Sequence, residues 1–167
     1  MEPSYKTFVS IGNGKQFFSR LLNMVDKNAH CLPKPILVQS GHTPFVSNQC
    51  SVVDFVNMDH FKKYMMEAEI VILHAGAGSV MHAIKMGKCP IVMPRMAKFD
   101  EVVNDHQVHF ADVLHRQEKV FLINQAEELI SAVQKVREKA SCVQGDSSVS
   151  MAMDIIKNRL SNMLGSR

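Results

Sequence analysis

Short apolar runs alternate with amphipathic stretches along most of this chain. Each run is four to six residues long and ends at Gly, Pro or polar residues, which fits a buried strand better than a helix. The stretches between the runs carry apolar residues at a spacing of three and four, which is typical of helices. The predicted strands are residues 7–11, 36–39, 51–56, 70–73, 89–93 and 120–123. The predicted helices are residues 15–28, 58–68, 79–86, 104–118, 125–139 and 151–164.

Strands that alternate with helices indicate an α/β domain with a mainly parallel sheet. At 167 residues the chain is long enough for one domain with a sizeable core. We expect this domain to span residues 1–140. The polar stretch 141–148 reads as a linker to the last helix, residues 151–164. That helix could dock a partner chain or pack back on its own domain, and the segment 141–167 is therefore a possible docking element.

The stretch from Ile70 to Gln107 organises the chain. Its first strand runs into the sequence His-Ala-Gly-Ala-Gly-Ser at residues 74–79, which can turn tightly, and Ser79 stands where a helix N-cap would. Gly87 then ends the helix, and Pro94 ends the next strand. A glycine-bearing loop that opens a helix presents unpaired N–H groups and a positive helix end to an anion. The loop therefore favours a phosphate or diphosphate site, although a turn that needs small residues only for packing would look the same.

Composition narrows the class of partner. Hydrophobic residues make up 46% and charged residues 21% of the chain, and the formal net charge of +3 is too weak to indicate nucleic acid. No run of about 18 apolar residues predicts a membrane span, and the first residues do not resemble a signal peptide. The four cysteines form no CxxC pair, which favours reduced cytosolic thiols.

Two competing motifs are weak. Gly12-Asn13-Gly14 follows the first strand as in a dinucleotide-binding fingerprint, but Phe17 stands at the third glycine position, and the second strand ends in Gln39 instead of an acidic residue. His106, His109 and Asp112 share a helical spacing but lack a fourth ligand. We therefore expect neither a nicotinamide or flavin cofactor nor a metal.

The combined pattern from His74 to Gln107 carries a resemblance to a known family. The segments are 74–79, Gly-Lys-Cys-Pro at 87–90, Val-Met-Pro-Arg at 92–95 and Glu-Val-Val-Asn-Asp-His-Gln at 101–107. They resemble the carboxyl-terminal half of GT-B glycosyltransferases of family 28. The likeness is greater to the small split members: the catalytic subunit of the two-chain N-acetylglucosaminyltransferase of dolichol-linked oligosaccharide synthesis, and bacterial exopolysaccharide and capsule transferase subunits. It covers residues 5–125.

The resemblance implies a Rossmann-like domain that forms the nucleotide-sugar half of a GT-B enzyme, with a UDP-sugar as substrate and no metal. Transfer in this family is expected to invert the anomeric centre. The implied donor diphosphate and nucleotide residues are Gly76, Ala77, Gly78, Ser79, His82 and Arg95. The implied donor-sugar residues are Asn104, Asp105 and Gln107, and the acceptor-side loop is Gly12 and Asn13. His74 is the candidate base, although a contact with the loop or with phosphate is the favoured role.

Two departures from the family pattern change the picture. Many members carry a glutamate that grips the ribose hydroxyls where this chain has His82, and Asp105 or Glu101 could substitute for it. A chain of 167 residues is too short to contain the second α/β half of a GT-B enzyme. The resemblance to the split members therefore implies a membrane-anchored partner that presents a lipid-linked acceptor. The chain would then be cytoplasmic and peripheral to the cytosolic face of a membrane. A nucleotide-sugar-binding or regulatory module without turnover is the alternative, and His82 favours it.

Overall fold

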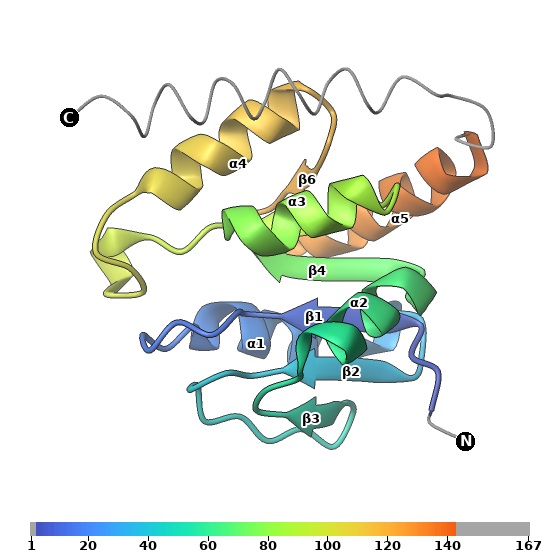
Figure 1. Ribbon diagram of the computed structural model, residues 1–167, viewed down its shortest axis with the longest axis horizontal. Helices are drawn as coiled ribbons and strands as arrows, with labels where there is room; N and C mark the ends of the chain where they lie inside the picture. The colour runs from blue at the N-terminus through green and yellow to red at the C-terminus, as the bar shows by residue number, and fades with distance from the viewer. Residues whose placement is uncertain (1–2, 143–167) are drawn as a thin grey trace. The chain divides into compact units, whose positions relative to one another are not determined.

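A six-stranded sheet forms the centre of the computed structural model, which describes residues 3–142 (Figure 1). The strands lie in the order β3–β2–β1–β4–β5–β6, and every neighbouring pair is parallel. Their bounds are β1 (Thr7–Ser10), β2 (Ile36–Gln39), β3 (Ser51–Val53), β4 (Ile70–His74), β5 (Ile91–Met93) and β6 (Phe121–Leu122). The prediction of a parallel α/β sheet is confirmed.

Helices connect the strands. They are α1 (Ser19–Lys27), α2 (Met58–Glu67), α3 (Ala77–Lys85), α4 (His106–Arg116) and α5 (Glu127–Cys142), with single 3₁₀ turns η1 (Ala29–Cys31) and η2 (Ala97–Phe99). No helix among residues 3–142 is both long enough and apolar enough to cross a membrane. The compact unit that ends at Arg137 contains the whole sheet. The predicted helix at 151–164 and most of the linker at 141–148 lie outside the described residues.

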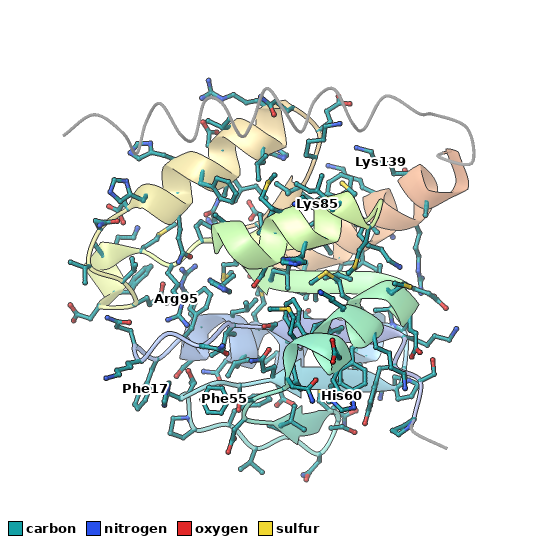
Figure 2. All side chains as sticks on the ribbon, in the orientation of Figure 1. Phe17, Phe55, His60, Lys85, Arg95 and Lys139 are labelled. Carbon is teal, nitrogen blue, oxygen red and sulfur yellow. The ribbon has the colours of Figure 1, made fainter. Side chains whose placement is uncertain are left out.

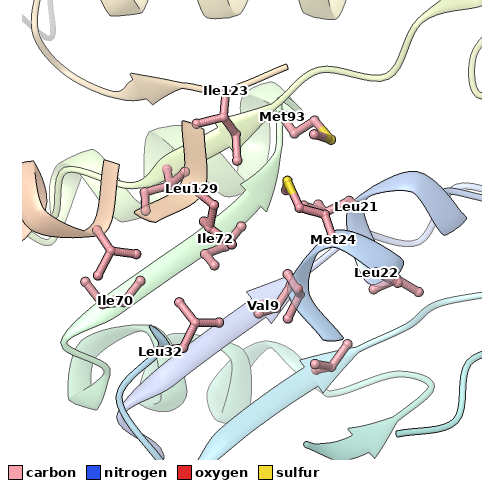
Figure 3. Packing of buried hydrophobic residues seen from close by; sticks show 14 of the residues in the cluster. Val9, Leu21, Leu22, Met24, Leu32, Ile70, Ile72, Met93, Ile123 and Leu129 are labelled. Atoms are coloured by element: carbon pink, nitrogen blue, oxygen red, sulfur yellow. The ribbon is translucent and has the colours of Figure 1, made fainter. Parts of the chain in front are cut away.

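Successive side chains of the central strands point to opposite faces of the sheet, and both faces are covered. On one face, Val9 and Ile72 pack with buried residues of α1 and with Leu129 at the start of α5 (Figure 3). On the other face, Phe8 meets Phe61 of α2 edge to face, with the ring centroids 5.4 Å apart. Burial on both faces explains why the central strands read as continuous apolar runs.

Several predicted elements are shorter in the structure. α1 begins at Ser19 instead of residue 15, β3 ends at Val53 instead of residue 56, and β5 begins at Ile91 instead of residue 89. β6 consists only of Phe121–Leu122, although residues 120–123 were predicted. The strands end where pairing to a neighbour ends, which local sequence does not reveal.

The strand order reverses between β1 and β4, which are neighbours in the sheet. Loops that leave the carboxyl ends of two such strands diverge to opposite faces and leave a crevice, and ligands of open parallel sheets bind there. The glycine-bearing segments at residues 12–14 and 76–78 leave these two strand ends. The fold therefore brings together two motifs that lie more than 60 residues apart in the sequence.

Candidate functional site

The His74 side chain lies between two glycines at the crevice. A Cβ added to Gly12 would lie 2.4 Å from Nε2 of His74, and one added to Gly76 would lie 2.1 Å from Cε1. Gly12 also has a φ of +74°, a backbone conformation that side chains disfavour. No side chain larger than hydrogen fits at either position while the ring stays in place, so the two loops close around the imidazole.

Helix α3 begins directly after this contact. Gly76 is its N-cap residue, and Ala77, Gly78 and Ser79 form the first turn. The prediction that Ser79 would be the N-cap is therefore wrong by three positions, because the chain already turns helical where Gly76 passes the His74 ring. No side chain caps the helix. The N–H groups of the first turn have no acceptor within the helix and mark its positive end.

Burial keeps His74 uncharged. Desolvation lowers its pKa to about 4, with a smaller contribution from the nearby positive charge of Arg95, while the Gln107 side chain opposes the shift. The Nδ1 atom is buried and has no hydrogen-bond partner in the part of the chain that the structure describes. At neutral pH the ring is therefore a hydrogen-bonding group and not a cation.

We expect His74 to stay neutral at pH 5.5, where a free imidazole is roughly 90% protonated. Because the folded-state pKa lies below the unfolded one, the unfolded chain binds more protons between pH 6.5 and about 4. The stability that a neutral His74 contributes is present above pH 6.5 and is lost as the pH falls through this window. Imidazole ¹⁵N shifts measured during a pH titration check this, and a midpoint near 6.5 would contradict it.

Buried polar side chains position the loop that follows β1. The Ser10 hydroxyl donates to Oε1 of Gln39 at 2.8 Å, and the Gln39 amide donates to Oδ1 of Asn13 at 3.0 Å. The main-chain N–H of Gly12 donates to the Ser10 hydroxyl at 3.2 Å. Ser10 and Gln39 are buried, so their pairing satisfies groups that would otherwise be costly to desolvate. Asn13 is exposed at the end of this chain of hydrogen bonds.

Arg95 follows β5 and is only 4% exposed. Its guanidinium donates to the carbonyl oxygens of Ile11 at 2.9 Å, Gln16 at 2.8 Å and Glu101 at 3.1 Å. Burial lowers its pKa, and the nearby Glu101 acts in the opposite direction. A direct contact between Arg95 and a diphosphate stays a prediction, but the observed contacts are those of a side chain that holds loops.

The predicted donor-sugar residues lie at the start of α4. Asn104 and Asp105 are exposed, and Gln107 is half-buried. The Asp105 carboxylate accepts from the N–H of Ala97 at 2.9 Å, and Oε1 of Gln107 accepts from the N–H of Arg95 at 3.2 Å. Both side chains thus hold the segment that connects β5 to α4, and both keep further hydrogen-bonding capacity.

Sequence reasoning missed the ion pair between Arg20 and Glu101. Nε of Arg20 donates to one carboxylate oxygen at 3.0 Å and Nη2 to the other at 2.8 Å, and Glu101 is 5% exposed. The carboxylate also accepts from the N–H of Met96 at 3.0 Å. A lone glutamate in a charged loop carries no sequence signal for a partner 81 residues away. Because these groups engage its carboxylate, Glu101 is poorly placed to replace the missing ribose ligand.

His82 lies one turn into α3 and is half-buried. Its Nδ1 lies 3.0 Å from the carbonyl oxygen of Gly78. Since a carbonyl only accepts, Nδ1 carries the hydrogen in this contact, and in a neutral ring Nε2 is left as an acceptor.

The surface of the described residues has two shallow depressions, and one of them lies beside the loops that follow β1 and β5. One, of about 410 Å³, is lined by Lys15, Gln16, Phe17, Phe99 and Asp100, beside the loops that follow β1 and β5. The larger, of about 540 Å³, lies where β2 and β3 begin, at the opposite edge of the sheet. Among the described residues no three His, Cys, Asp or Glu side chains are gathered as a metal site would require.

Relatives of this chain carry a consistent name. The chain is 28% identical over 115 residues to the UDP-N-acetylglucosamine transferase subunit ALG13 of Yarrowia lipolytica, a match that covers 68% of this chain and 57% of that protein. It is 27% identical over 106 residues to the human protein of the same name, covering 59% of this chain and 9% of the human protein. The chain thus spans little more than half of the yeast relative and a small part of the human one.

Solved structures show the same fold. Spinosyn forosaminyltransferase SpnP superposes with a TM-score of 0.63 at 13% identity, covering 99% of this chain and 45% of that one. MurG of Acinetobacter baumannii gives a TM-score of 0.53 at 17% identity, covering 95% of this chain and 51% of that one. These are GT-B glycosyltransferases, so the sheet has the Rossmann-like architecture of one GT-B half. Residues 8–158 match the model of the glycosyltransferase family 28 C-terminal domain, and this chain belongs to that family.

Proposed function

We propose that this chain is the donor-binding half of an inverting glycosyltransferase that uses UDP-N-acetylglucosamine. The observation that carries the proposal is the start of α3, an uncapped first turn that follows the carboxyl end of β4, where β4 lies beside β1 and the strand order reverses. The relatives, which are named as subunits of a UDP-N-acetylglucosamine transferase, support the choice of donor.

The donor diphosphate would accept hydrogen bonds from the main-chain N–H groups at residues 76–79. Departure of UDP leaves negative charge on the β-phosphate, and a fixed helix end stabilises such charge without reorganisation. Nε2 of His82 would accept from a ribose hydroxyl, which supplies one of the contacts that a glutamate makes elsewhere in the family. Asn104, Asp105 and Gln107 would contact the sugar. No metal or other cofactor is needed for these steps.

A low pKa makes His74 a weak base. We therefore propose that it hydrogen-bonds the loops or a phosphate oxygen, and that the group which deprotonates the acceptor comes from elsewhere. The loop of Gly12 and Asn13 would face the acceptor.

A partner chain would supply the acceptor-binding half. The relatives of this chain are named as subunits of a UDP-N-acetylglucosamine transferase, which supports an assembly with a second chain. In the proposed assembly the partner is anchored in a membrane and presents a lipid-linked sugar. The chain itself would then lie at the cytosolic face of that membrane.

A charge placed at the helix start tests the donor site. A Cβ at Gly78 would meet no atom within 4 Å, so a side chain fits there in the free protein. We expect Gly78→Asp to weaken UDP-N-acetylglucosamine binding by about tenfold or more relative to Gly78→Asn, because the carboxylate repels the diphosphate. The two variants differ in charge and hardly in shape, and an acidic residue in the first turn favours the helix.

Isothermal calorimetry provides the measurement, with the unmodified chain expected to bind on the order of 1 µM to 1 mM. Equal affinities for the two variants would place the diphosphate elsewhere. If millimolar UDP does not compete with UDP-N-acetylglucosamine for the chain, the proposed donor is wrong. In the same preparation the chain alone should transfer no sugar to a lipid-linked acceptor, and rapid transfer would refute the need for a partner.

A further inference from the structure

Arg95 touches two loops that leave different strands. The β1 loop is residues 11–18, and the β5 loop is residues 94–105. Figure 2 shows Arg95 beyond the strand ends, between these two segments. Its guanidinium donates to Ile11 and Gln16 in the β1 loop and to Glu101 in the β5 loop, at 2.8–3.1 Å, with a longer contact of 3.5 Å to Phe17. All four acceptors are main-chain carbonyls, so the side chain fixes backbone positions in both loops.

The surroundings leave the guanidinium little freedom. Arg95 is 4% exposed, and its Cζ lies 4.8 Å from the centroid of the Phe18 ring. A planar fork of donors can meet several carbonyls at fixed angles, which the single ammonium of lysine cannot do. The carbonyl oxygens also replace the water that would surround the buried positive charge. A substitution that removes the guanidinium would therefore remove all of these contacts together.

The main chain of the same residue contacts the start of α4. The main-chain N–H of Arg95 donates to Oε1 of Gln107 at 3.2 Å. From the other side, Arg20 of α1 binds the Glu101 carboxylate through two hydrogen bonds, and its Nη2 also donates to the Pro94 carbonyl at 2.8 Å. The β5 loop is thus tied to α1 at Pro94 and at Glu101, and to the β1 loop through the Arg95 side chain.

We infer that Arg95 is a positioning residue that sets the donor-sugar segment, residues 104–107, relative to the acceptor-side loop at Gly12 and Asn13. The names given to these two sides rest on the proposed function. The diphosphate-binding turn of α3 lies outside the set of carbonyls that Arg95 holds. Loss of the guanidinium should therefore weaken the contacts with the sugar far more than the contacts with the diphosphate.

The link between the loops is tested without ligand. In Arg95→Lys we expect amide hydrogen exchange to become about tenfold faster or more in both the β1 loop and the β5 loop, while β1, β4 and the first turn of α3 keep their protection. Arg116→Lys is the matched control, since Arg116 is exposed and pairs with Asp112 one turn away on the same helix. Faster exchange in one loop alone, or throughout the protein, would overturn the inference.

The role of Arg95 in binding is tested by the ratio of the affinity for UDP-N-acetylglucosamine to the affinity for UDP. We expect Arg95→Lys to lower the affinity for UDP-N-acetylglucosamine by roughly fivefold more than the affinity for UDP, because a displaced loop misplaces the sugar contacts. A merely destabilised fold would weaken both ligands alike and leave the ratio unchanged, which would refute a positioning role. If the unmodified chain binds neither ligand, the proposed function is wrong. The hydrogen-exchange experiment would still test whether Arg95 connects the β1 loop to the β5 loop.

A second variant covers the case in which Arg95→Lys does not fold. Arg20→Lys keeps Arg95 but replaces the two-pronged contact with Glu101, and we expect faster exchange in the β5 loop and the same direction of change in the affinity ratio. An unchanged β5 loop together with an unchanged ratio would overturn the inference.

Discussion

Gly76→Ala should lower the free energy of unfolding by about 1–3 kcal/mol, the range found for overpacked sites. The new methyl carbon would lie 2.1 Å from Cε1 and 2.6 Å from Nε2 of His74. The ring is also confined by the other loop, because even a Cβ added at Gly12 would lie only 2.4 Å from Nε2. Either the imidazole leaves its place or the start of α3 moves. Urea unfolding followed by circular dichroism measures the change.

Gly78→Ala is the matched control two residues away. A Cβ at this position meets nothing within 4 Å, and the backbone is helical. Replacing a helical glycine by alanine adds about 0.5–1 kcal/mol of stability. The two substitutions make the same chemical change with opposite expected signs. Equal losses in both variants would show that the His74 contact does not decide the cost.

Glu101→Gln should cost about 2–3 kcal/mol, less than the loss expected for a fully buried pair because the Arg20 side chain keeps 23% of its exposure. The substitution removes the charge that faces the Arg20 guanidinium at 2.8 Å. Glutamine would also turn an amide toward donors, either those of Arg20 or the N–H of Met96. The loss is read from the urea midpoint at constant slope.

An exposed ion pair of the same kind provides the comparison. Asp112 and Arg116 lie one turn apart on α4, 2.8 Å from each other, with 43% and 77% of their side-chain surfaces exposed. Water and salt screen such a pair, and Asp112→Asn should cost no more than about 0.5 kcal/mol. A similar cost for both substitutions would mean that burial of Glu101 contributes nothing.

Periodicity predicted the sheet well and the helix starts less well. β2 was predicted at its observed bounds, since apolar residues flanked by proline and polar residues mark a buried strand without further information. The start of α1 was predicted four residues early. In the structure Arg95 binds the carbonyls of Gln16 and Phe17, and the hydroxyl of Thr43 accepts from the N–H of Phe18. These partners come from distant parts of the chain and hold residues 16–18 out of the helix.

The candidate site shows the same division. The sequence predicted the glycine loop and the strand ends on either side of it. Both follow from the local pattern and from the rule that ligands bind beyond the carboxyl ends of parallel strands. The error at Ser79 has a tertiary cause: serine is a better N-cap by propensity, but the turn must pass His74 at a position that admits no side chain. Contacts such as those of Arg20, Glu101 and Arg95 join residues up to 84 positions apart and leave no periodic trace.

The Nδ1 atom of His74, which has no hydrogen-bond partner among residues 3–142, has a consequence for ligand capture. An uncharged imidazole exists as two tautomers, with the hydrogen on one nitrogen or on the other. A ligand oxygen that reaches the ring would select one of them by offering an acceptor or a donor. The selection moves a hydrogen within the ring and leaves the number of bound protons unchanged. Capture and release of such a ligand at His74 would thus proceed without exchanging protons with the surrounding buffer.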